Sequence, residues 1–260
     1  MGIPRIHPRA EIDSHAELAP DVEVGPFAVI ERDVVIGAGT RILAGAHIRA
    51  HTTLGCGNLV RDHAVLGGNP QDLGYKGAVT MARIGDRNIF AEGVTIHRGT
   101  AAGSETVIGN DCFFMANSHA AHNCIVQDHV ILANGAMLGG HSTVGERAFV
   151  SGNVAVHQNV RVGRLSMLSG VGSFTVDVPP FALVSDRNRL RGMNSVGVRR
   201  AGIRRDAVKG LRGAFRDLFQ QRRNLTLARE ELVARGGLGP EVLELLDFIE
   251  SSVRGVCRMS

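Results

Sequence analysis

The chain has 260 residues, of which 44% are apolar and 33 are glycine, with no tryptophan and one tyrosine. That length suits one large domain or two small ones around an aliphatic core. The first 25 residues are interrupted by charges, and nothing approaches the roughly 18–20 apolar residues that a membrane-spanning helix needs. We therefore expect a cytoplasmic protein with no signal peptide and no stable membrane insertion.

The C-terminal part of the chain is basic. Residues 187–260 hold 16 Lys and Arg against 8 Asp and Glu, a net +8, so residues 1–186 sum to −4 because the whole chain is +4. A basic tail on an acidic body suits nucleic acid, a membrane surface or an acidic protein. No aromatic residues interleave with these arginines as single-strand stacking requires, which disfavours nucleic acid.

The four cysteines form no C-x-x-C pair and have no spacing typical of a zinc site. We interpret Cys56, Cys112, Cys124 and Cys257 as reduced thiols with structural roles.

An apolar residue recurs every six positions from the start of the chain. Eleven consecutive positions between Ile6 and Leu66 obey this rule, which chance at this composition gives roughly once in ten thousand trials. The period resumes at Ile84 and runs unbroken from Ile108 to Phe174. Helices repeat near 3.6 and strands near 2, whereas hexapeptides are typical of a parallel β-helix. Three hexapeptides then form one triangular coil, and coils stack about 4.8 Å apart.

Two breaks and one change of pattern divide the chain. The breaks at 67–82 and 99–106 predict loops, which commonly carry function on a rigid scaffold. After Pro179 and Pro180 the hexapeptides fade and helical spacing appears, as at Val208, Leu211, Phe215, Leu218 and Phe219. A second helix is predicted from an Asn224 N-cap to Gly236, and a third from Pro240. We expect a β-helix domain over 1–186 and a helical domain over 187–260.

The 18-residue coil period aligns several histidines. His122, Gly140 and Gln158 share one column, and His141 and His157 each lie one residue from it. Neighbouring members should have Cα atoms roughly 5–6 Å apart, from the strand spacing plus one residue of offset. His119 lies in the same turn as His122. We call His122, His141 and His157 the histidine strip.

The histidine strip has three interpretations. Outward side chains of a β-helix are often polar, so the histidines could be surface residues without a role. A metal site is disfavoured because no Asp, Glu or Cys falls in register with them. An imidazole is also suited to general-base catalysis. No Ser or Cys nucleophile joins the strip. The catalytic interpretation is therefore direct transfer of a group to the acceptor, without a cofactor, in which His122 deprotonates a bound hydroxyl.

Several segments together resemble the acyl-ACP–UDP-N-acetylglucosamine O-acyltransferase family, which starts lipid A synthesis. They are IGDRN (84–88), VTIHRGT (94–100), NPQDLGYKG (69–77), HAAHNC (119–124), LGGHSTVG (138–145), AVHQN (155–159) and DVPP (177–180). The resemblance covers nearly the whole chain in order, and NPQDLGYKG with TIHRGT and HAAHNC is its most specific part.

The resemblance implies a homotrimer of left-handed prisms with sites between neighbours. It implies transfer of a 3-hydroxyacyl chain from acyl carrier protein to the 3-hydroxyl of UDP-N-acetylglucosamine. His122 falls on the general base, and backbone amides near Gly140 on the oxyanion site. The substrate-binding positions are His141, Gln158 and Asp72 for the sugar, His119 and His157 for the pocket, Asn194 and Arg200 for the nucleotide and its phosphates, and Gly170 for acyl length.

The chain departs from the family pattern at four positions. Asn123 stands where Asp usually follows the base, and Gly74 where Lys is frequent. Val196 replaces an acidic residue and Ala201 a second Arg. Two alternatives therefore stay open. One is N-acyl transfer to a 3-amino sugar nucleotide, since a neutral amine depends less on a strong base. The other is a non-catalytic β-helix that binds nucleotide sugar or carrier protein.

Overall fold

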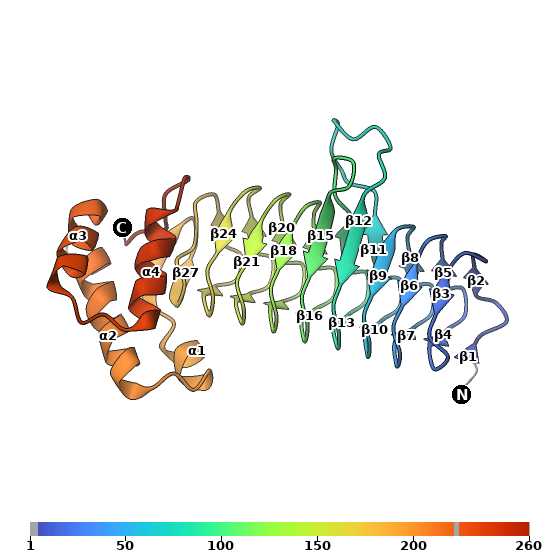
Figure 1. The fold of residues 1–260 in the computed structure, drawn as a ribbon, viewed down its shortest axis with the longest axis horizontal. Coiled ribbons are helices and arrows are strands. Elements are labelled where there is room, and N and C mark those ends of the chain that lie inside the picture. Colours follow the sequence, from blue (N-terminus) through green and yellow to red (C-terminus); the bar gives the residue numbers. More distant parts are fainter. Residues whose placement is uncertain (1–4, 221–223, 260) are drawn as a thin grey trace.

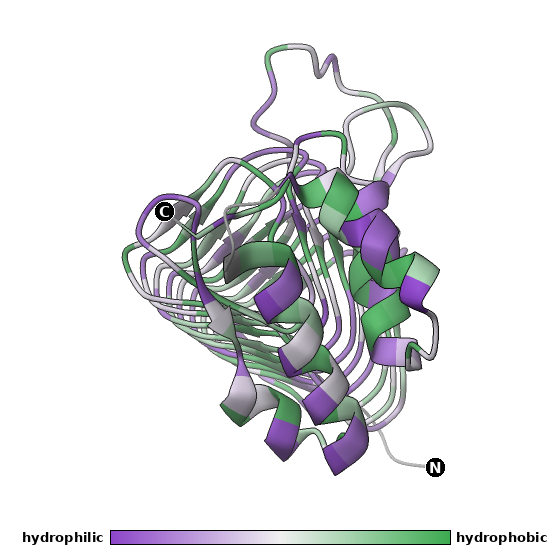
Figure 2. Ribbon diagram, turned by 90° about the vertical axis from the view of Figure 1, so that its left-hand side faces the viewer, coloured by the Kyte–Doolittle hydropathy of each residue, from purple (hydrophilic) through white to green (hydrophobic). Residues whose placement is uncertain are grey.

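The computed structural model describes residues 5–220 and 224–259. They form a long prism of short stacked strands with a group of helices at its C-terminal end (Figure 1). Viewed from that end, each coil of the prism traces a triangle (Figure 2). Strands one coil apart pair in parallel register at 18-residue intervals where no loop intervenes, as His119 pairs with Met137 and Met137 with Ala155.

Three sheets make the sides of the prism. Sheet 1 contains β1 (Arg5–Ile6), β4 (Glu23–Val24), β7 (Arg41–Ile42), β10 (Leu59–Val60), β13 (Ile89–Phe90), β16 (Phe113–Phe114), β19 (Ile131–Leu132), β22 (Phe149–Val150), β25 (Met167–Leu168), β27 (Ala182–Ser185) and β28 (Arg189–Met193). Sheet 2 contains β2 (Glu11–Ile12), β5 (Val29–Ile30), β8 (His47–Ile48), β11 (Val65–Gly68), β14 (Thr95–His97), β17 (His119–Ala120), β20 (Met137–Leu138), β23 (Ala155–Val156) and β26 (Ser173–Phe174). Sheet 3 contains β3 (Glu17–Leu18), β6 (Val35–Ile36), β9 (Thr52–Leu54), β12 (Met81–Ile84), β15 (Glu105–Ile108), β18 (Ile125–Val126), β21 (Thr143–Val144) and β24 (Arg161–Val162).

The hexad residues point into the prism. Ile30, Ile36, Ile42 and Ile48 are at most 1% exposed, and the same is true of most later members. Each such burial stabilises the fold by about 1.5–3 kcal/mol before entropy is counted. The first coil is the end of the stack, so Ile6 there remains 45% exposed.

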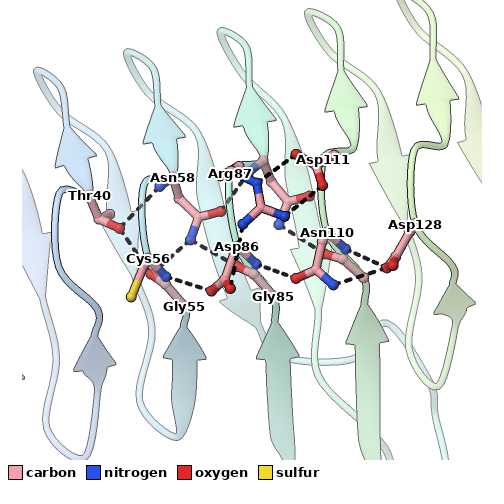
Figure 3. Close-up of polar contacts among 12 residues, drawn as sticks. Thr40, Gly55, Cys56, Asn58, Gly85, Asp86, Arg87, Asn110, Asp111 and Asp128 are labelled. Atoms are coloured by element: carbon pink, nitrogen blue, oxygen red, sulfur yellow. Dashed lines mark hydrogen bonds and ion pairs between the residues drawn. The ribbon is translucent and has the colours of Figure 1, made fainter.

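The corner between sheets 3 and 1 contains a ladder of side-chain amides (Figure 3). Asn58 Nδ2 donates to the carbonyls of Gly55 and Gly85 at 2.9 Å each, and its Oδ1 accepts from the Asn88 N–H. Asn88 repeats the pattern one coil later, with its Oδ1 accepting from the N–H of Cys112 at 2.8 Å. The ladder thereby gives partners to backbone groups that would otherwise be buried and unpaired.

Both predicted loops project from the prism and lie against one another (Figure 1). The first joins β11 to β12 and the second joins β14 to β15. The N–H of Gly99 donates to the carbonyl of Met81, and that of Gly103 to the carbonyl of Val79. The longer loop is therefore supported at its base by the shorter one.

The helices are α1 (Ser195–Arg200), α2 (Arg205–Phe215) with its π-helical extension η1 (Arg216–Gln220), α3 (Leu225–Arg235) and α4 (Pro240–Glu250). The predicted starts of α3 and α4 are confirmed: Asn224 Oδ1 accepts from the Thr226 N–H, and Pro240 is the first residue of α4. Sequence analysis did not anticipate α1 or β28. The boundary at residue 186 stays a prediction, since β28 still pairs, antiparallel, with β27.

After α4 the chain returns to the last coil. The N–H of Asp177 donates to the Gly255 carbonyl, and the Cys257 N–H to the Asp177 carbonyl, both at 2.9 Å. The Asp177 carboxylate, 1% exposed, accepts from Arg161 Nε and from Ser252 Oγ. We call residues 251–259 the return segment. Within the described ranges, no helix is long and apolar enough to span a bilayer.

Candidate active site

His122 lies at the corner between sheets 2 and 3, on the turn between β17 and β18, and is 8% exposed. Its Nδ1 is 3.0 Å from Asn123 Oδ1, which also accepts from Thr100 Oγ1 at 3.0 Å. An amide oxygen can only accept, so His122 Nδ1 carries the proton and Nε2 has its lone pair free. This is the tautomer that a general base at Nε2 requires.

The backbone conformation of the corner fixes the position of Asn123. It has φ near 59°, a left-handed conformation that Asn tolerates better than most residues. Its N–H donates to Thr106 Oγ1 at 2.7 Å. The amide is therefore held on both its backbone and its side chain, and it fixes the imidazole rotamer of His122.

Asp72 reaches the strip from the first loop. Its Oδ2 is 3.7 Å from His122 Nε2, and its Oδ1 accepts from the Gly74 N–H at 2.6 Å. The expectation that no carboxylate would join the histidines considered only residues in register, whereas Asp72 comes from outside the repeat. Even so, no three His, Cys, Asp or Glu side chains among the described residues are arranged so that they could hold a metal ion.

Arg98 ties that loop to the prism. Its Nη1 donates to the Gly67 carbonyl at 3.1 Å, and its Nη2 to Asn69 Oδ1 at 2.6 Å and toward the Tyr75 hydroxyl at 3.3 Å. These contacts lie on both sides of Asp72 in the sequence. Arg98 also lies one coil before His122, because Thr95 pairs with His119. Sequence analysis did not single it out, since the loop at 99–106 hides this 24-residue spacing.

His97 and His119 extend the cluster inward. Their ring centroids are 4.7 Å apart, edge to face, and His119 Nδ1 is 2.7 Å from Thr95 Oγ1. Burial, with smaller contributions from His119 and His122, lowers the pKa of His97 to about 4. Burial likewise lowers the pKa of His119, against a hydrogen bond to the Thr95 backbone that raises it. Both rings are therefore neutral at physiological pH. His97 was also missed from sequence, although it belongs to the quoted VTIHRGT segment.

Gly140 leaves the space that the His122 ring occupies. A Cβ on Gly140 would lie 2.4 Å from His122 Cε1 and 2.6 Å from Nε2. The neighbouring N–H groups of Gly139 and His141 donate to the carbonyls of Val156 and His122, whereas that of Gly140 donates to no described residue. A free N–H on the residue that packs against the His122 ring suits a developing oxyanion.

The other two histidines continue the strip at the same corner. The rings of His122 and His141 are 5.2 Å apart, edge to face. His157 and Gln158 follow one coil later and are both exposed. The structure thus brings the three strip histidines, His119, Gly140, Gln158 and Asp72 to one corner.

Gly170, Asn194 and Arg200 lie elsewhere on the chain. Gly170 is on the corner between sheets 1 and 2, after β25. Asn194 and Arg200 line a pocket over sheet 1 that also includes His129, Arg147 and Met167. The Asn194 side chain caps α1, accepting from the Gly197 N–H and donating to the Leu165 carbonyl. The predicted residues therefore occupy three different sides of one prism.

The cysteines contribute no nucleophile to this corner. Burial raises the pKa of Cys112, Cys124 and Cys257 to about 12. Cys56 is exposed but lies beside the amide ladder, at the corner between sheets 3 and 1. The site therefore has bases, amides and a free N–H, and the described cysteines supply no activated thiol to it.

A triangular β-helix with such a corner defines the class of hexapeptide-repeat transferases. Residues 105–140 match the family model for the bacterial transferase hexapeptide, and residues 177–257 match that for domain 2 of UDP N-acetylglucosamine O-acyltransferase. The chain belongs to the acyl-ACP–UDP-N-acetylglucosamine O-acyltransferase family. The resemblance and the predicted fold class, a left-handed parallel β-helix followed by a small helical part, are confirmed.

Curated relatives and solved structures support this assignment. The chain is 42% identical over 188 residues to the enzyme of that name from Gloeothece citriformis, covering 72% of this chain and 68% of that one. It is 42% identical over 199 residues to that from Burkholderia mallei, covering 74% and 76%. The structure of UDP-N-acetylglucosamine acyltransferase from Bacteroides fragilis superposes with a TM-score of 0.94 at 36% identity, covering 97% and 99%. The structure of UDP-N-acetylglucosamine acyltransferase from Campylobacter jejuni superposes with a TM-score of 0.92 at 35% identity, covering 98% of this chain and 100% of that one.

Proposed function

We propose that this chain transfers a 3-hydroxyacyl group from acyl carrier protein to the 3-hydroxyl of UDP-N-acetylglucosamine, as the first step of lipid A synthesis. Membership of the family supports the reaction. Its mechanism rests on one observation above all: Asn123 Oδ1 accepts from His122 Nδ1 and leaves Nε2 free as a base.

The reaction needs one proton transfer and one nucleophilic attack. His122 Nε2 takes the proton of the acceptor hydroxyl while the oxygen attacks the thioester carbonyl. The Gly140 N–H stabilises the oxyanion, a type of interaction worth about 3 kcal/mol per donor. Collapse of the intermediate expels the carrier thiolate, which receives the proton from the imidazolium. Asp72, next to Nε2, is suited to hold a sugar hydroxyl.

The active assembly in this proposal is a homotrimer whose sites lie between copies. The basis is the placement of the predicted residues on three sides of one prism, which no single small substrate can span. A neighbouring copy that faced the histidine corner with its sheet 1 would supply Asn194 and Arg200. Symmetry would then generate three equal sites.

The carrier protein is acidic in this proposal, and the helical end of the prism attracts it. The pocket over α2 is lined by Arg199, Arg205, Lys209 and Arg212. A concentrated positive charge raises the rate of encounter with an acidic partner and makes that rate sensitive to salt.

The test is an acyl-transfer assay with purified chain, UDP-N-acetylglucosamine and a mixture of 3-hydroxyacyl carrier proteins, with the product identified by mass spectrometry. We expect an ester-linked product, and we expect His122→Ala to lower turnover by about 10²- to 10⁴-fold. His15→Ala, exposed on the first coil, is the control. Unchanged turnover in His122→Ala would show that His122 is not the base. If the unaltered chain forms no product, the remaining hypothesis is a non-catalytic β-helix that binds nucleotide sugar or carrier protein.

A second acceptor is favoured by Asn123. An amide orients the imidazole but stabilises its cation less than a carboxylate, and a neutral amine requires less help from a base than a hydroxyl. The same assay with the 3-amino analogue of the sugar nucleotide decides between them. A higher kcat/KM for the analogue, with an amide-linked product, would make the chain an N-acyltransferase.

A further inference from the structure

The return segment adds a guanidinium to the end of the histidine strip. Arg254 Nη2 is 3.5 Å from His157 Nδ1, and its Nε donates to the Thr175 carbonyl at 3.2 Å. Thr175 lies one coil beyond His157, since Ala155 pairs with Ser173. From His122 to His157 and then to Arg254, the corner between sheets 2 and 3 therefore carries a continuous line of nitrogen bases and cations.

Arg254 is held in place by contacts of the residues on either side of it. Ser252 Oγ donates to the buried Asp177 carboxylate at 2.8 Å, and the Gly255 carbonyl accepts from the Asp177 N–H. The buried Cys257 follows two residues later. The guanidinium is thus presented from a docked segment and not from a free chain end.

Arg254 differs from neighbouring arginines because no described carboxylate pairs with it. Arg161 pairs with Asp177 at 2.9 Å, and Arg191 with Asp186 at 2.7 Å, both at this end of the prism. Arg254 is an exposed residue that uses Nε on a carbonyl, and its Nη2 lies beside the exposed imidazole of His157. A guanidinium presents its donors in a fixed fork that matches the oxygens of a phosphate.

We propose that Arg254, with His157, forms a binding site for a phosphate ester of the substrates, namely the phosphodiester in the prosthetic arm of the acyl carrier. This inference rests on the proposed function. Three coils separate the rung of His122 from that of Arg254, about 14 Å at the usual spacing. The pantetheine arm places a long flexible chain between thioester and phosphate, whereas the acceptor hydroxyl is only a few bonds from the phosphates of its nucleotide. The line also runs toward the basic helical end, where an acidic carrier would dock.

The test compares donors with and without the phosphate. Initial rates are measured with acyl-phosphopantetheine and with acyl-pantetheine, for the unaltered chain, Arg254→Gln and Arg254→Lys. We expect the unaltered chain to prefer the phosphorylated donor by about tenfold in kcat/KM, Arg254→Gln to lose that preference, and Arg254→Lys to keep part of it. The KM for UDP-N-acetylglucosamine should change less than twofold. Arg258→Gln, exposed on the same segment, is the matched control.

Two outcomes overturn the proposal. Equal losses with both donors would mean that Arg254 only supports the fold, and a rise confined to the KM of the nucleotide sugar would assign the site to the nucleotide phosphates. Binding of 4′-phosphopantetheine, measured by calorimetry, gives a readout without turnover. About tenfold weaker binding to Arg254→Gln supports the phosphate site even if the unaltered chain transfers nothing, in which case only the proposed function fails; equal binding rejects the site.

Discussion

Asn123 Oδ1 lies 3.0 Å from His122 Nδ1 and fixes the proton-bearing nitrogen of the ring. Because the amide is neutral, it does not offset the positive charge that the imidazole gains in the proposed proton transfer. We expect Asn123→Asp to raise kcat for the hydroxyl acceptor by about three- to thirtyfold, since a carboxylate at this distance stabilises the cation. Steady-state rates with both acceptors check this.

The amine acceptor is the internal control for Asn123→Asp, since its rate should change little. Loss of activity with the hydroxyl acceptor would contradict the interpretation. Such a loss would show that a negative charge beside the His122 ring disturbs its position, since Asp keeps both the oxygen that accepts from Thr100 Oγ1 and the backbone N–H that donates to Thr106 Oγ1.

Gly140 sets the position of the His122 ring, the proposed base, because it has no side chain. An added Cβ would meet the His122 ring at 2.4 Å, so Gly140→Ala must displace the imidazole. We expect kcat to fall by about 10²-fold, the effect of a misplacement of roughly 1 Å, with little change in thermal stability. Gly213→Ala, in the last turn of α2 with nothing within 4 Å of an added Cβ, is the control and should keep full activity. Near-normal kcat in Gly140→Ala would separate the ring position from catalysis.

The hexapeptide period was sufficient to predict the coil, the strip and both loops. The prediction succeeded because the apolar residue of each hexapeptide can be buried only inside the prism. In addition, residues 18 positions apart occupy the same column wherever the repeat is unbroken. It failed for Asp72, His97 and Arg98, which are brought to His122 across loops of irregular length. It also failed for Arg254, since nothing local in the sequence shows that the chain returns to the last coil.

Arg98 holds the loop that carries Asp72. Removal of its guanidinium takes away contacts to the Gly67 carbonyl and Asn69 Oδ1. We expect Arg98→Ala to raise the KM for the sugar nucleotide by about tenfold and to speed hydrogen exchange in residues 69–78. Arg83→Gln removes an exposed arginine from β12, at the base of the same loop, and should change neither. If exchange accelerates while KM is unchanged, Asp72 has no part in sugar binding.

The proposed homotrimer, with sites shared between copies, makes a quantitative prediction for mixed trimers. His122→Ala and Arg200→Ala should each be nearly inactive alone. In a trimer with both variants, one of the three interfaces combines an intact His122 with an intact Arg200, so coexpression in equal amounts should recover about a quarter of normal activity. Rates on the copurified mixture, using two different affinity tags, measure this. No recovery would place both residues in the same copy's site or rule out the trimer.

His97 makes the stability of the fold depend on pH. Its pKa is about 4 in the folded protein because it is buried, against about 6.5 when the chain is unfolded. The unfolded chain therefore binds more protons between these values, and the contribution of His97 is complete above pH 6.5 and lost as the pH falls toward 4. We expect a loss of about 2–3 kcal/mol from this residue over that interval. Urea unfolding of the unaltered chain and of His97→Gln at a series of pH values isolates the contribution of His97, because the carboxylates titrate in both proteins and cancel in the difference. Parallel curves for the two proteins would show that His97 takes up its proton in the folded state as readily as in the unfolded one.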